Sequence, residues 1–402
     1  MTTTTANNEK NLATKKLVSA QTNQQNARTF DKIAAMTKSN SFPQTLSEFL
    51  QQTGAQMQFY DMGRRLVEIP GADMLAIERQ QQAYPQPFLR SAALAVLFSY
   101  PDNNAASNDQ QIWFLKFPLD EQGLLQQAAR DDFLRRMMER LAEQALAKHD
   151  PESTQNPPDI PEDNPHGFTP REDRMACFHA RVAKQLGRPA SQFYAHAADY
   201  FTGSNGFEQW NFVGLQGIAD VATRLDENDN LATLIKAIPH LPITPFAALC
   251  SCLENETIDP ALSAALSARI STALQETDTN IAANTIAAAI RGLSYGNDQQ
   301  ALIAALHSVL DSNSGRNVEV LATIAGRAWQ CLEQTDTRRN FLYNLALCDA
   351  GQKAFDNIMA DLMFMPGLRQ PLLDELRDLR EADNCTQSQV DRINHFFQSL
   401  QT

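Results

Sequence analysis

The chain has 402 residues, enough for two or three domains, and a hydrophobic fraction of 43% supports a sizeable buried core. Its formal net charge is −13 at pH 7. Because affinity for nucleic acid depends on clustered Lys and Arg, this charge argues against a general nucleic-acid-binding protein and against a partner on anionic membrane surfaces.

The six cysteines are scattered and show neither a disulfide framework nor zinc-ligand spacing. Cys250 and Cys252 lie two positions apart on an expected helix, so they point to different faces. We therefore expect free core thiols, a cytoplasmic protein, and neither a metal nor a cofactor. No run of about 18 apolar residues is present, so we expect no membrane insertion.

Residues 1–42 are rich in Thr, Asn and Gln, and basic residues outnumber acidic ones there. Such a composition buries too little apolar surface to offset the entropy of ordering, so we expect a disordered basic tail. Docking of this tail on the acidic body or on a partner is the alternative.

Residues 43–148 are expected to form an α+β domain, an antiparallel sheet with helices on one side. Gln56–Asp61 and Arg64–Ile69 alternate polar and apolar residues around a Met-Gly turn, which predicts a β-hairpin. Ala92–Tyr100 and Ile112–Phe117 predict a second hairpin, with a helix over Leu89–Phe98 as the alternative.

Helices complete this domain. A short helix is expected around Leu46–Leu50, and another over Ala72–Gln82. Pro118 ends the last strand, and Leu119–Lys148 is expected to be one long helix.

Residues 149–168 are rich in Pro and acidic residues, which favours an extended linker. Residues 169–402 read as one amphipathic helix after another, including Arg171–Leu186 and Pro189–Phe201. Helix-turn-helix units recur at roughly 35 to 45 residues, but no residue pattern repeats cleanly. We expect a mainly α region, either a HEAT-like α-solenoid or an irregular helical bundle.

Two helix starts carry specific capping signals. Asp259 followed by Pro260 is typical of an N-cap with Pro at the first helical position. Thr386 and Gln389 have the spacing of a capping box.

The densest group of charged residues lies in the α+β domain. Arg64 and Arg65 follow Asp61 at the expected hairpin turn, and Asp120 and Glu121 are expected in the first turn of the long helix. A pairing of either arginine with either acid would make a recognition patch or an acid–base site, whereas turn chemistry with surface ion pairs is the interpretation we favour. The candidate interaction surface comprises Asp61, Arg64, Arg65, Lys116, Asp120, Glu121 and Trp210.

Two further segments are candidates for contact surfaces. Pro170–Ala176 alternates charges at the start of the first helix after the linker, which indicates a salt-bridged surface or a seam against the α+β domain. Seven aromatic residues fall between Phe193 and Phe212, and aromatic side chains dominate binding hot spots. We favour a packed joint between two helical subdomains over a binding surface for this group.

No motif with a known catalytic mechanism is present in the sequence. It contains no Gly-x-Ser-x-Gly elbow, no Gly-x-Gly-x-x-Gly loop and no Walker pattern. His179 and His196 lie on successive expected helices, but two histidines without a carboxylate pattern do not predict a metal site. We therefore assign no catalytic, cofactor-binding or metal residue.

Three stretches, Asp61–Arg65, Ile112–Gly123 and Gln209–Asp220, resemble segments of an uncharacterised proteobacterial protein family, a domain of unknown function. The resemblance covers the chain from residue 44 to its C-terminal end. It implies a bacterial, cytoplasmic protein, and it carries no activity and no ligand residue.

We expect a non-enzymatic adaptor or scaffold whose helical array holds a protein partner. One alternative is an enzyme of unfamiliar type with a site between the α+β domain and the first helices after the linker. The other is a chaperone-like client binder. Convergence of the charged candidates in one pocket would favour the enzyme.

Overall fold

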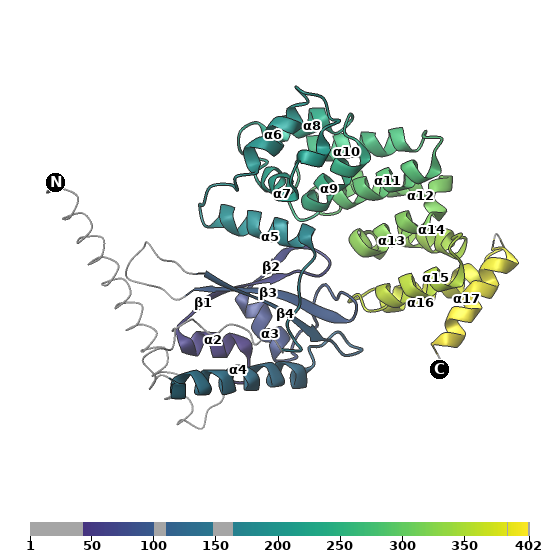
Figure 1. Ribbon diagram of the computed structural model, residues 1–402. Helices are drawn as coiled ribbons and strands as arrows, with labels where there is room; N and C mark the ends of the chain where they lie inside the picture. Colours follow the sequence, from purple (N-terminus) through teal and green to yellow (C-terminus); the bar gives the residue numbers. More distant parts are fainter. Residues whose placement is uncertain (1–42, 100–109, 148–163, 384, 401–402) are drawn as a thin grey trace, which may run out of the picture.

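The computed structural model describes residues 43–99, 110–147, 164–383 and 385–400 (Figure 1). It contains a small antiparallel sheet near the N-terminus followed by a mainly helical region, which confirms the expected fold class. The predicted tail at 1–42 and most of the predicted linker lie outside the described residues, and the domain boundaries stay predictions.

The sheet has four antiparallel strands in the order β2-β1-β3-β4. The strands are β1 (Gln56–Asp61), β2 (Val67–Ile69), β3 (Ser91–Ser99) and β4 (Gln110–Pro118). Both predicted hairpins are therefore confirmed, although β2 begins three residues later than expected. The first three residues of that segment, Arg64, Arg65 and Leu66, belong to the turn between β1 and β2, and their contacts are described below.

Both faces of the sheet are buried, and the register explains how. Phe59, Val96 and Trp113 are paired across β1, β3 and β4, so their side chains share one face. Tyr60 and Ala95, the next pair along, lie on the opposite face in a different core. A strand covered on both sides needs apolar residues at every position, which is the reason β3 shows no polar alternation.

Three helices cover the first face: α2 (Leu46–Thr53), α3 (Gly71–Glu78) and α4 (Gln127–Ala147). The buried carboxylate of Glu78 joins two of them, because it accepts hydrogen bonds from the backbone N–H groups of Leu46 and Ser47 at 2.5 and 3.1 Å. Those N–H groups belong to the first turn of α2 and have no partner within the helix. An acid at the end of α3 thus caps the start of α2.

The long helix predicted from Leu119 begins only at Gln127, so this prediction is wrong at its start. Oδ1 of Asp120 accepts hydrogen bonds from the N–H groups of Gln122 and Leu124, both at 2.9 Å. Gly123 has a φ of +76°, in the left-handed region. The Asp side chain thus satisfies the backbone in a turn conformation that competes with the helix.

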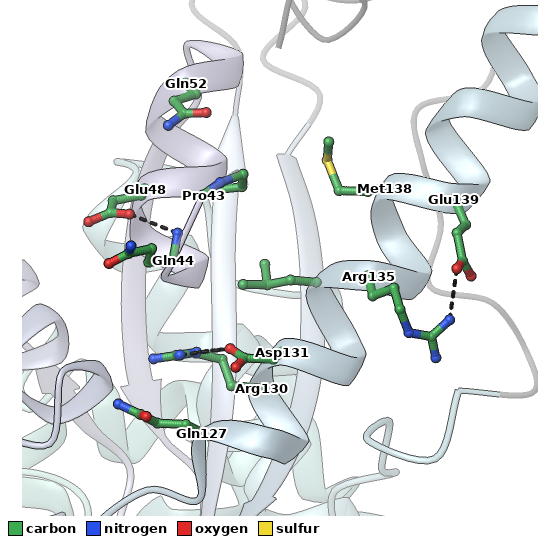
Figure 2. A pocket seen from close by; sticks show the side chains of 11 residues that line it. Pro43, Gln44, Glu48, Gln52, Gln127, Arg130, Asp131, Arg135, Met138 and Glu139 are labelled. Carbon is green, nitrogen blue, oxygen red and sulfur yellow. Dashed lines mark hydrogen bonds and ion pairs between the residues drawn. The ribbon is translucent and has the colours of Figure 1, made fainter. Parts of the chain in front are cut away.

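An open groove of about 1090 Å³ lies between α2 and α4, and Figure 2 shows its lining residues. Acidic side chains that line it form ion pairs with arginines: Glu48 pairs with Arg79 at 2.9 Å, and Asp131 pairs with Arg130 at 2.7 Å. The groove begins at Pro43, the first described residue.

The second face of the sheet packs against α5 (Glu172–Gln185), the first helix after the predicted linker. The ring of Phe178 makes edge contacts with Tyr60 at 5.4 Å and with Phe114 at 5.8 Å between centroids. Phe168 just before this helix donates its N–H to the carbonyl of Phe114 at 3.2 Å, so the end of the predicted linker runs along the free edge of β4.

The helices from α5 onward stack in two rows, and each helix contacts the next one of its own row. This regular stacking is the architecture of an α-solenoid rather than of an irregular bundle. The first row comprises α5, α7 (Leu215–Thr223), α9 (Ile243–Leu253), α11 (Thr279–Leu293), α13 (Val318–Arg327), α15 (Gly351–Leu362) and α17 (Gln387–Ser399). The second row comprises α6 (Tyr194–Thr202), α8 (Asn230–Ala237), α10 (Pro260–Ala273), α12 (Gln299–Leu310), α14 (Thr335–Ala346) and α16 (Arg369–Glu381).

Short 3-10 turns connect some of these helices: η1 (Trp210–Phe212), η2 (Asn313–Arg316) and η3 (Trp329–Glu333). Both predicted capping signals are confirmed. The Asp259 side chain accepts from the N–H of Ala261, and Thr386 and Gln389 form a reciprocal capping box. Within the described part of the chain, no helix has the length and apolar character needed to cross a bilayer.

Candidate functional site at the junction of sheet and solenoid

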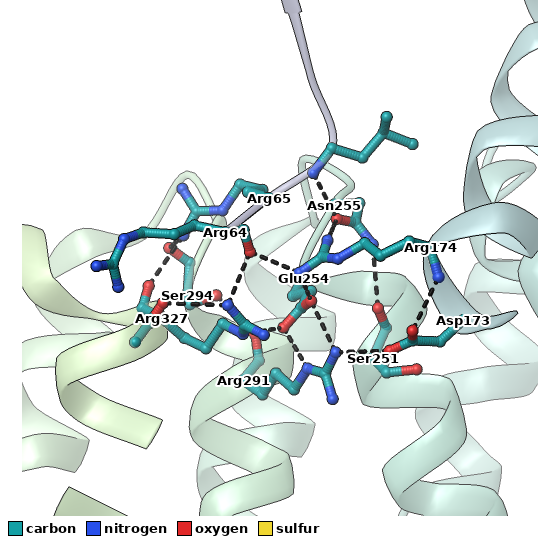
Figure 3. Close-up of polar contacts among 12 residues, drawn as sticks. Arg64, Arg65, Asp173, Arg174, Ser251, Glu254, Asn255, Arg291, Ser294 and Arg327 are labelled. Atoms are coloured by element: carbon teal, nitrogen blue, oxygen red, sulfur yellow. Dashed lines mark hydrogen bonds and ion pairs between the residues drawn. The ribbon is translucent and has the colours of Figure 1, made fainter. Parts of the chain in front are cut away.

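The β1–β2 turn, residues 62–66, inserts its two arginines into the first row of the solenoid (Figure 3). Arg64 donates from Nε to the carbonyl of Pro87 at 2.6 Å, and its Nη2 lies 2.7 Å from Oδ2 of Asp361 on α15. Its guanidinium also lies 5.5 Å from the ring centroid of Trp329. The Arg64 side chain is 1% exposed, so these contacts stand almost entirely in place of water.

Arg65 enters a neighbouring site lined by aromatic rings and carbonyl groups. Its Nη2 donates to the carbonyls of Ser294 and Arg327, both at 3.0 Å. Its guanidinium lies 4.5 Å from the ring centroid of Tyr295 and 5.1 Å from that of Trp329. Among the described residues Arg65 forms no ion pair, and its buried Nε and Nη1 have no hydrogen-bond partner. Burial lowers the pKa of this guanidinium to about 10.

Side chains of the solenoid hold the backbone of the same turn. The carbonyl of Arg64 accepts from Nη2 of Arg174 at 2.5 Å and from Nη1 of Arg327 at 2.9 Å. The N–H of Leu66 donates to Oδ1 of Asn255 at 2.9 Å, and its carbonyl accepts from Nη1 of Arg181 at 2.7 Å. Buried backbone groups need such partners, so the turn is fitted to this surface by hydrogen bonds as well as by charge.

A fully buried carboxylate, Glu254, is the centre of the ion-pair network beneath the turn. Its Oε1 lies 2.5 Å from Nη2 of Arg174, and its Oε2 lies 3.0 Å from Nε of Arg327. Arg291 binds both oxygens in a bidentate pair and also reaches Asp173 at 3.0 Å. Burial by itself would raise the pKa of Glu254, but the surrounding guanidinium groups outweigh it and lower that pKa. Asp173, Arg174, Glu254, Arg291 and Arg327 are called the Glu254 cluster below.

The junction holds more positive than negative charge. Four guanidinium groups, those of Arg64 and the three arginines of the Glu254 cluster, share three carboxylates, those of Asp361, Glu254 and Asp173, and Arg65 adds a fifth cation without an ion pair among the described residues. A fourth carboxyl, Asp61, accepts hydrogen bonds from Tyr84 Oη at 2.5 Å and Gly63 N at 2.7 Å. Complete burial raises its pKa to about 7, so in neutral solution it is only partly ionised and offsets only part of the excess.

A cavity of about 170 Å³ opens beside the turn, between the sheet and the start of α5. Its apolar walls include Met62, Phe88 and Phe168. Its charged walls are Lys116, Arg171, Arg174 and Arg327, and no carboxylate is among the described residues that line it.

The structure brings some of the predicted site residues together and separates others. Asp61, Arg64 and Arg65 meet at the junction but are buried, and Lys116 lines the cavity with an exposed side chain. The alternative pairing of either arginine with Asp120 or Glu121 does not occur, because Arg64 pairs with Asp361 and the two acids lie in the loop before α4. The favoured interpretation holds for the turn at Asp120, but surface ion pairs are wrong for Arg64 and Arg65, which are buried.

The last residue of the candidate surface, Trp210, lies in η1 at the start of the solenoid, and it is not part of the junction. The predicted seam between Pro170–Ala176 and the α+β unit is confirmed, because Nη2 of Arg174 donates a hydrogen bond to the carbonyl of Arg64. Sequence reasoning missed Glu254, Asn255, Arg291 and Arg327. The one signal for them is a Glu-Asn pair directly after the apolar helix α9.

No metal-binding group of three or more His, Cys, Asp or Glu residues occurs in the described ranges. His179 is exposed and lies edge-on to Phe178 at 6.0 Å between ring centroids, and partial desolvation lowers its pKa.

The fold and the site define a class of protein: an α-solenoid to which a small α+β unit is locked by a buried arginine turn. The chain belongs to the family described as "Protein of unknown function (DUF3549)", which matches residues 43–390. No curated protein and no solved structure matches the chain.

Proposed function

We propose that the protein is a non-enzymatic scaffold that binds a protein partner through an aromatic surface at the start of the solenoid. This aromatic surface consists of Phe193, Trp210 and Phe212, which are 48%, 37% and 70% exposed. Phe193 lies 3.8 Å from the position that a Cβ of Gly214 would occupy, so it lies close to the chain segment that carries Phe212. Exposed aromatic side chains next to one another are typical of binding surfaces.

The aromatic group of this region has an inner and an outer half. Tyr200 and Phe201 are buried and in edge contact at 5.4 Å between centroids, and Tyr200 donates from Oη to the carbonyl of Phe207 at 3.1 Å. The inner half thus packs the joint between helices. The outer half contributes nothing comparable to this core, so its exposure supports a role in binding.

The charge around the aromatic surface suggests the chemistry of the partner. Asp199 and Glu208 are exposed on the same segment, and the whole chain carries a net charge of −13. A partner segment with apolar side chains flanked by basic ones would complement this surface. The same charge disfavours nucleic acid and anionic membrane surfaces as partners. We propose the cytoplasm as the compartment, in keeping with six free cysteines, five of them buried.

The two alternatives draw less support. An enzyme would use the junction cavity, but Asp120 and Glu121 do not line it, and Asp61, Arg64 and Arg65 are held in buried contacts. A chaperone-like binder would bind through the same aromatic surface that a scaffold would use. It differs in holding many unfolded clients instead of one partner in fixed ratio.

The test is affinity purification of the tagged protein from its native host, followed by mass spectrometry. We expect one partner in stoichiometric amount, lost in the double variant W210A/F212A and retained in the control I281A/L400A. The control removes two apolar side chains that are 49% and 46% exposed elsewhere. A partner retained by both variants would place binding elsewhere. Many substoichiometric clients would favour the chaperone, and a retained small molecule without a partner would favour the enzyme.

A further inference from the structure

The junction cavity differs in its charge from the groove between α2 and α4. Four cationic side chains reach it from three parts of the fold: Lys116 from β4, Arg171 and Arg174 from the start of α5, and Arg327 from α13. The groove between α2 and α4 instead mixes arginines with the acids that neutralise them. Cations gathered without acids repel one another unless an anion joins them.

The ion pairs behind the cavity do not remove this excess. Arg174 and Arg327 share Glu254 with Arg291, so one carboxylate serves three guanidinium groups. Burial and the neighbouring arginines, against the opposing effect of Glu254, lower the pKa of Arg327 to about 9. Lys116 forms no ion pair with any of the described residues, and Arg171 is paired only with Asp173.

The backbone around the cavity also favours negative charge. Thr169, Pro170 and Arg171 line it immediately before the first turn of α5, a helix of 14 residues. The N-cap residue Arg171 makes no side-chain capping bond, so the N-terminal end of this helix has no acceptor from its own cap. The helix dipole attracts anions to this end, although Oδ1 of Asp173 already accepts from the N–H of Arg174 at 2.9 Å. The dipole acts in the same direction as the four cationic side chains.

The size of the cavity restricts the ligand. Sites for drug-sized molecules have volumes of about 300–1,000 Å³, whereas this cavity has about 170 Å³. Inorganic phosphate or the phosphate of a very small ester fits such a space. Four cations favour a dianion over a monovalent carboxylate, and hydrogen bonds from ammonium and guanidinium groups to phosphate oxygens are strengthened by charge. Lys116 forms no ion pair among the described residues, whereas the three arginines would add the phosphate to the partners that they already bind.

We propose that this cavity binds a phosphate dianion, either free orthophosphate or the phosphoryl group of a small monoester. Lys116 and Gly63 belong to the sheet unit, whereas Arg171, Arg174 and Arg327 belong to the helical part. The bound anion bridges the two parts of the protein and neutralises the cations at their junction. Phosphate therefore strengthens the docking of the sheet on the solenoid.

The experiment measures the binding of orthophosphate, methyl phosphate and acetate to the full-length protein by calorimetry, at constant ionic strength with chloride as the background anion. The test variant is K116Q/R171Q, in which both changed side chains are exposed and lie outside the buried ion pairs of Glu254. The control variant R188Q/K236Q removes the same charge from exposed positions that do not line the cavity. Hydrogen exchange of the β1–β2 turn, with and without phosphate, gives a second readout that needs no calorimetric signal.

We expect orthophosphate to bind at one site, at least tenfold more weakly in K116Q/R171Q and within twofold of the wild type in R188Q/K236Q. Phosphate should also slow exchange at the β1–β2 turn in the wild type and not in K116Q/R171Q. Equal binding of methyl phosphate would identify a monoester as the ligand class, and its exclusion would identify the free ion. No phosphate binding, equal weakening in both variants, or acetate binding as tightly as phosphate would overturn the proposal.

Discussion

Nη2 of the buried Arg64 lies 2.7 Å from Oδ2 of Asp361, and this ion pair joins the first hairpin of the chain to α15 near the end of the solenoid. The contact has ion-pair rather than linear hydrogen-bond geometry. Arg64 is 1% exposed, whereas the Asp361 side chain is 26% exposed. The desolvated partner is thus the cation, and it depends on Asp361 for its only carboxylate in the described structure.

A double-mutant cycle measures this relationship. We expect Arg64→Gln and Asp361→Asn to be coupled by about 0.5–3 kcal/mol in the free energy of unfolding, because each change leaves the other group unpaired. The control cycle uses Arg377 and Asp374, which lie 2.6 Å apart with both side chains about half exposed. Exposed pairs contribute only about 0–1 kcal/mol, so a larger coupling there than at Arg64 would contradict the expectation.

The Glu254 cluster gives a second prediction. Glu254→Gln removes the shared carboxylate of three guanidinium groups, and breaking a buried pair in this way typically costs about 3–5 kcal/mol. Urea unfolding followed by fluorescence measures the loss. Glu381→Gln is the control, because that acid is 75% exposed and its nearest cation is 3.5 Å away. A loss below about 1 kcal/mol for Glu254→Gln would show that the cluster tolerates the missing charge.

Asp61 predicts a pH dependence of stability. Its pKa is raised from the usual 3.8 to about 7, so between about pH 4 and 7 the folded chain binds more protons than the unfolded chain. Stability therefore falls as pH rises through this window, by up to about 1.4 kcal/mol per pH unit.

Asp61→Asn cannot titrate, so the wild-type stability minus that of the variant should decline from pH 4 to 7. Chemical unfolding at several pH values measures this difference. A difference that is flat, or that increases with pH, would mean that Tyr84 and the nearby arginines stabilise the ionised form of Asp61 by more than burial destabilises it.

Gly217 in α7 packs so closely against the segment Phe193–Ala197 that a side chain has no room there. A Cβ there would lie 2.5 Å from the carbonyl oxygen of Phe193 and 2.9 Å from Cβ of Ala197. Because backbone is the obstacle, Gly217→Ala should destabilise the protein by about 1–3 kcal/mol. Gly326→Ala in α13 is the matched control: its Cβ meets nothing within 4 Å, and alanine favours the helix by about 0.5–1 kcal/mol. Equal melting temperatures for the two variants would contradict this geometry.

The junction also predicts the behaviour of a cleaved chain. A specific protease site placed within residues 148–163 cuts between the two parts that the β1–β2 turn holds together. We expect the two fragments to elute together in native gel filtration, because the buried contacts of Arg64 and Arg65 do not depend on chain connectivity. The double variant R64Q/R65Q should release them. Separation of the wild-type fragments would show that the junction is weaker than its burial indicates.

Much of the fold was readable along the chain, because it depends on local periodicity. Alternation over Gln56–Asp61 predicted β1, and the apolar segment at Ala92–Tyr100 predicted β3. Asp259 and Thr386 start their helices as their capping signals predict, because a cap needs only neighbours a few residues away. The start of α4 was missed, since the Asp120 side chain satisfies a turn that competes with the helix.

The sequence by itself determined the fold class, the order of the elements and the family, all of which depend on residues close together in the chain. Only the tertiary structure decided that Arg64 and Arg65 are buried. Their partners Ser294, Trp329 and Asp361 come from distant parts of the solenoid, and a guanidinium group leaves water only where such partners already stand in place. The same holds for the cationic cavity, because its charged residues come from β4, from α5 with the residue before it, and from α13. They lie together only where the solenoid packs against the sheet.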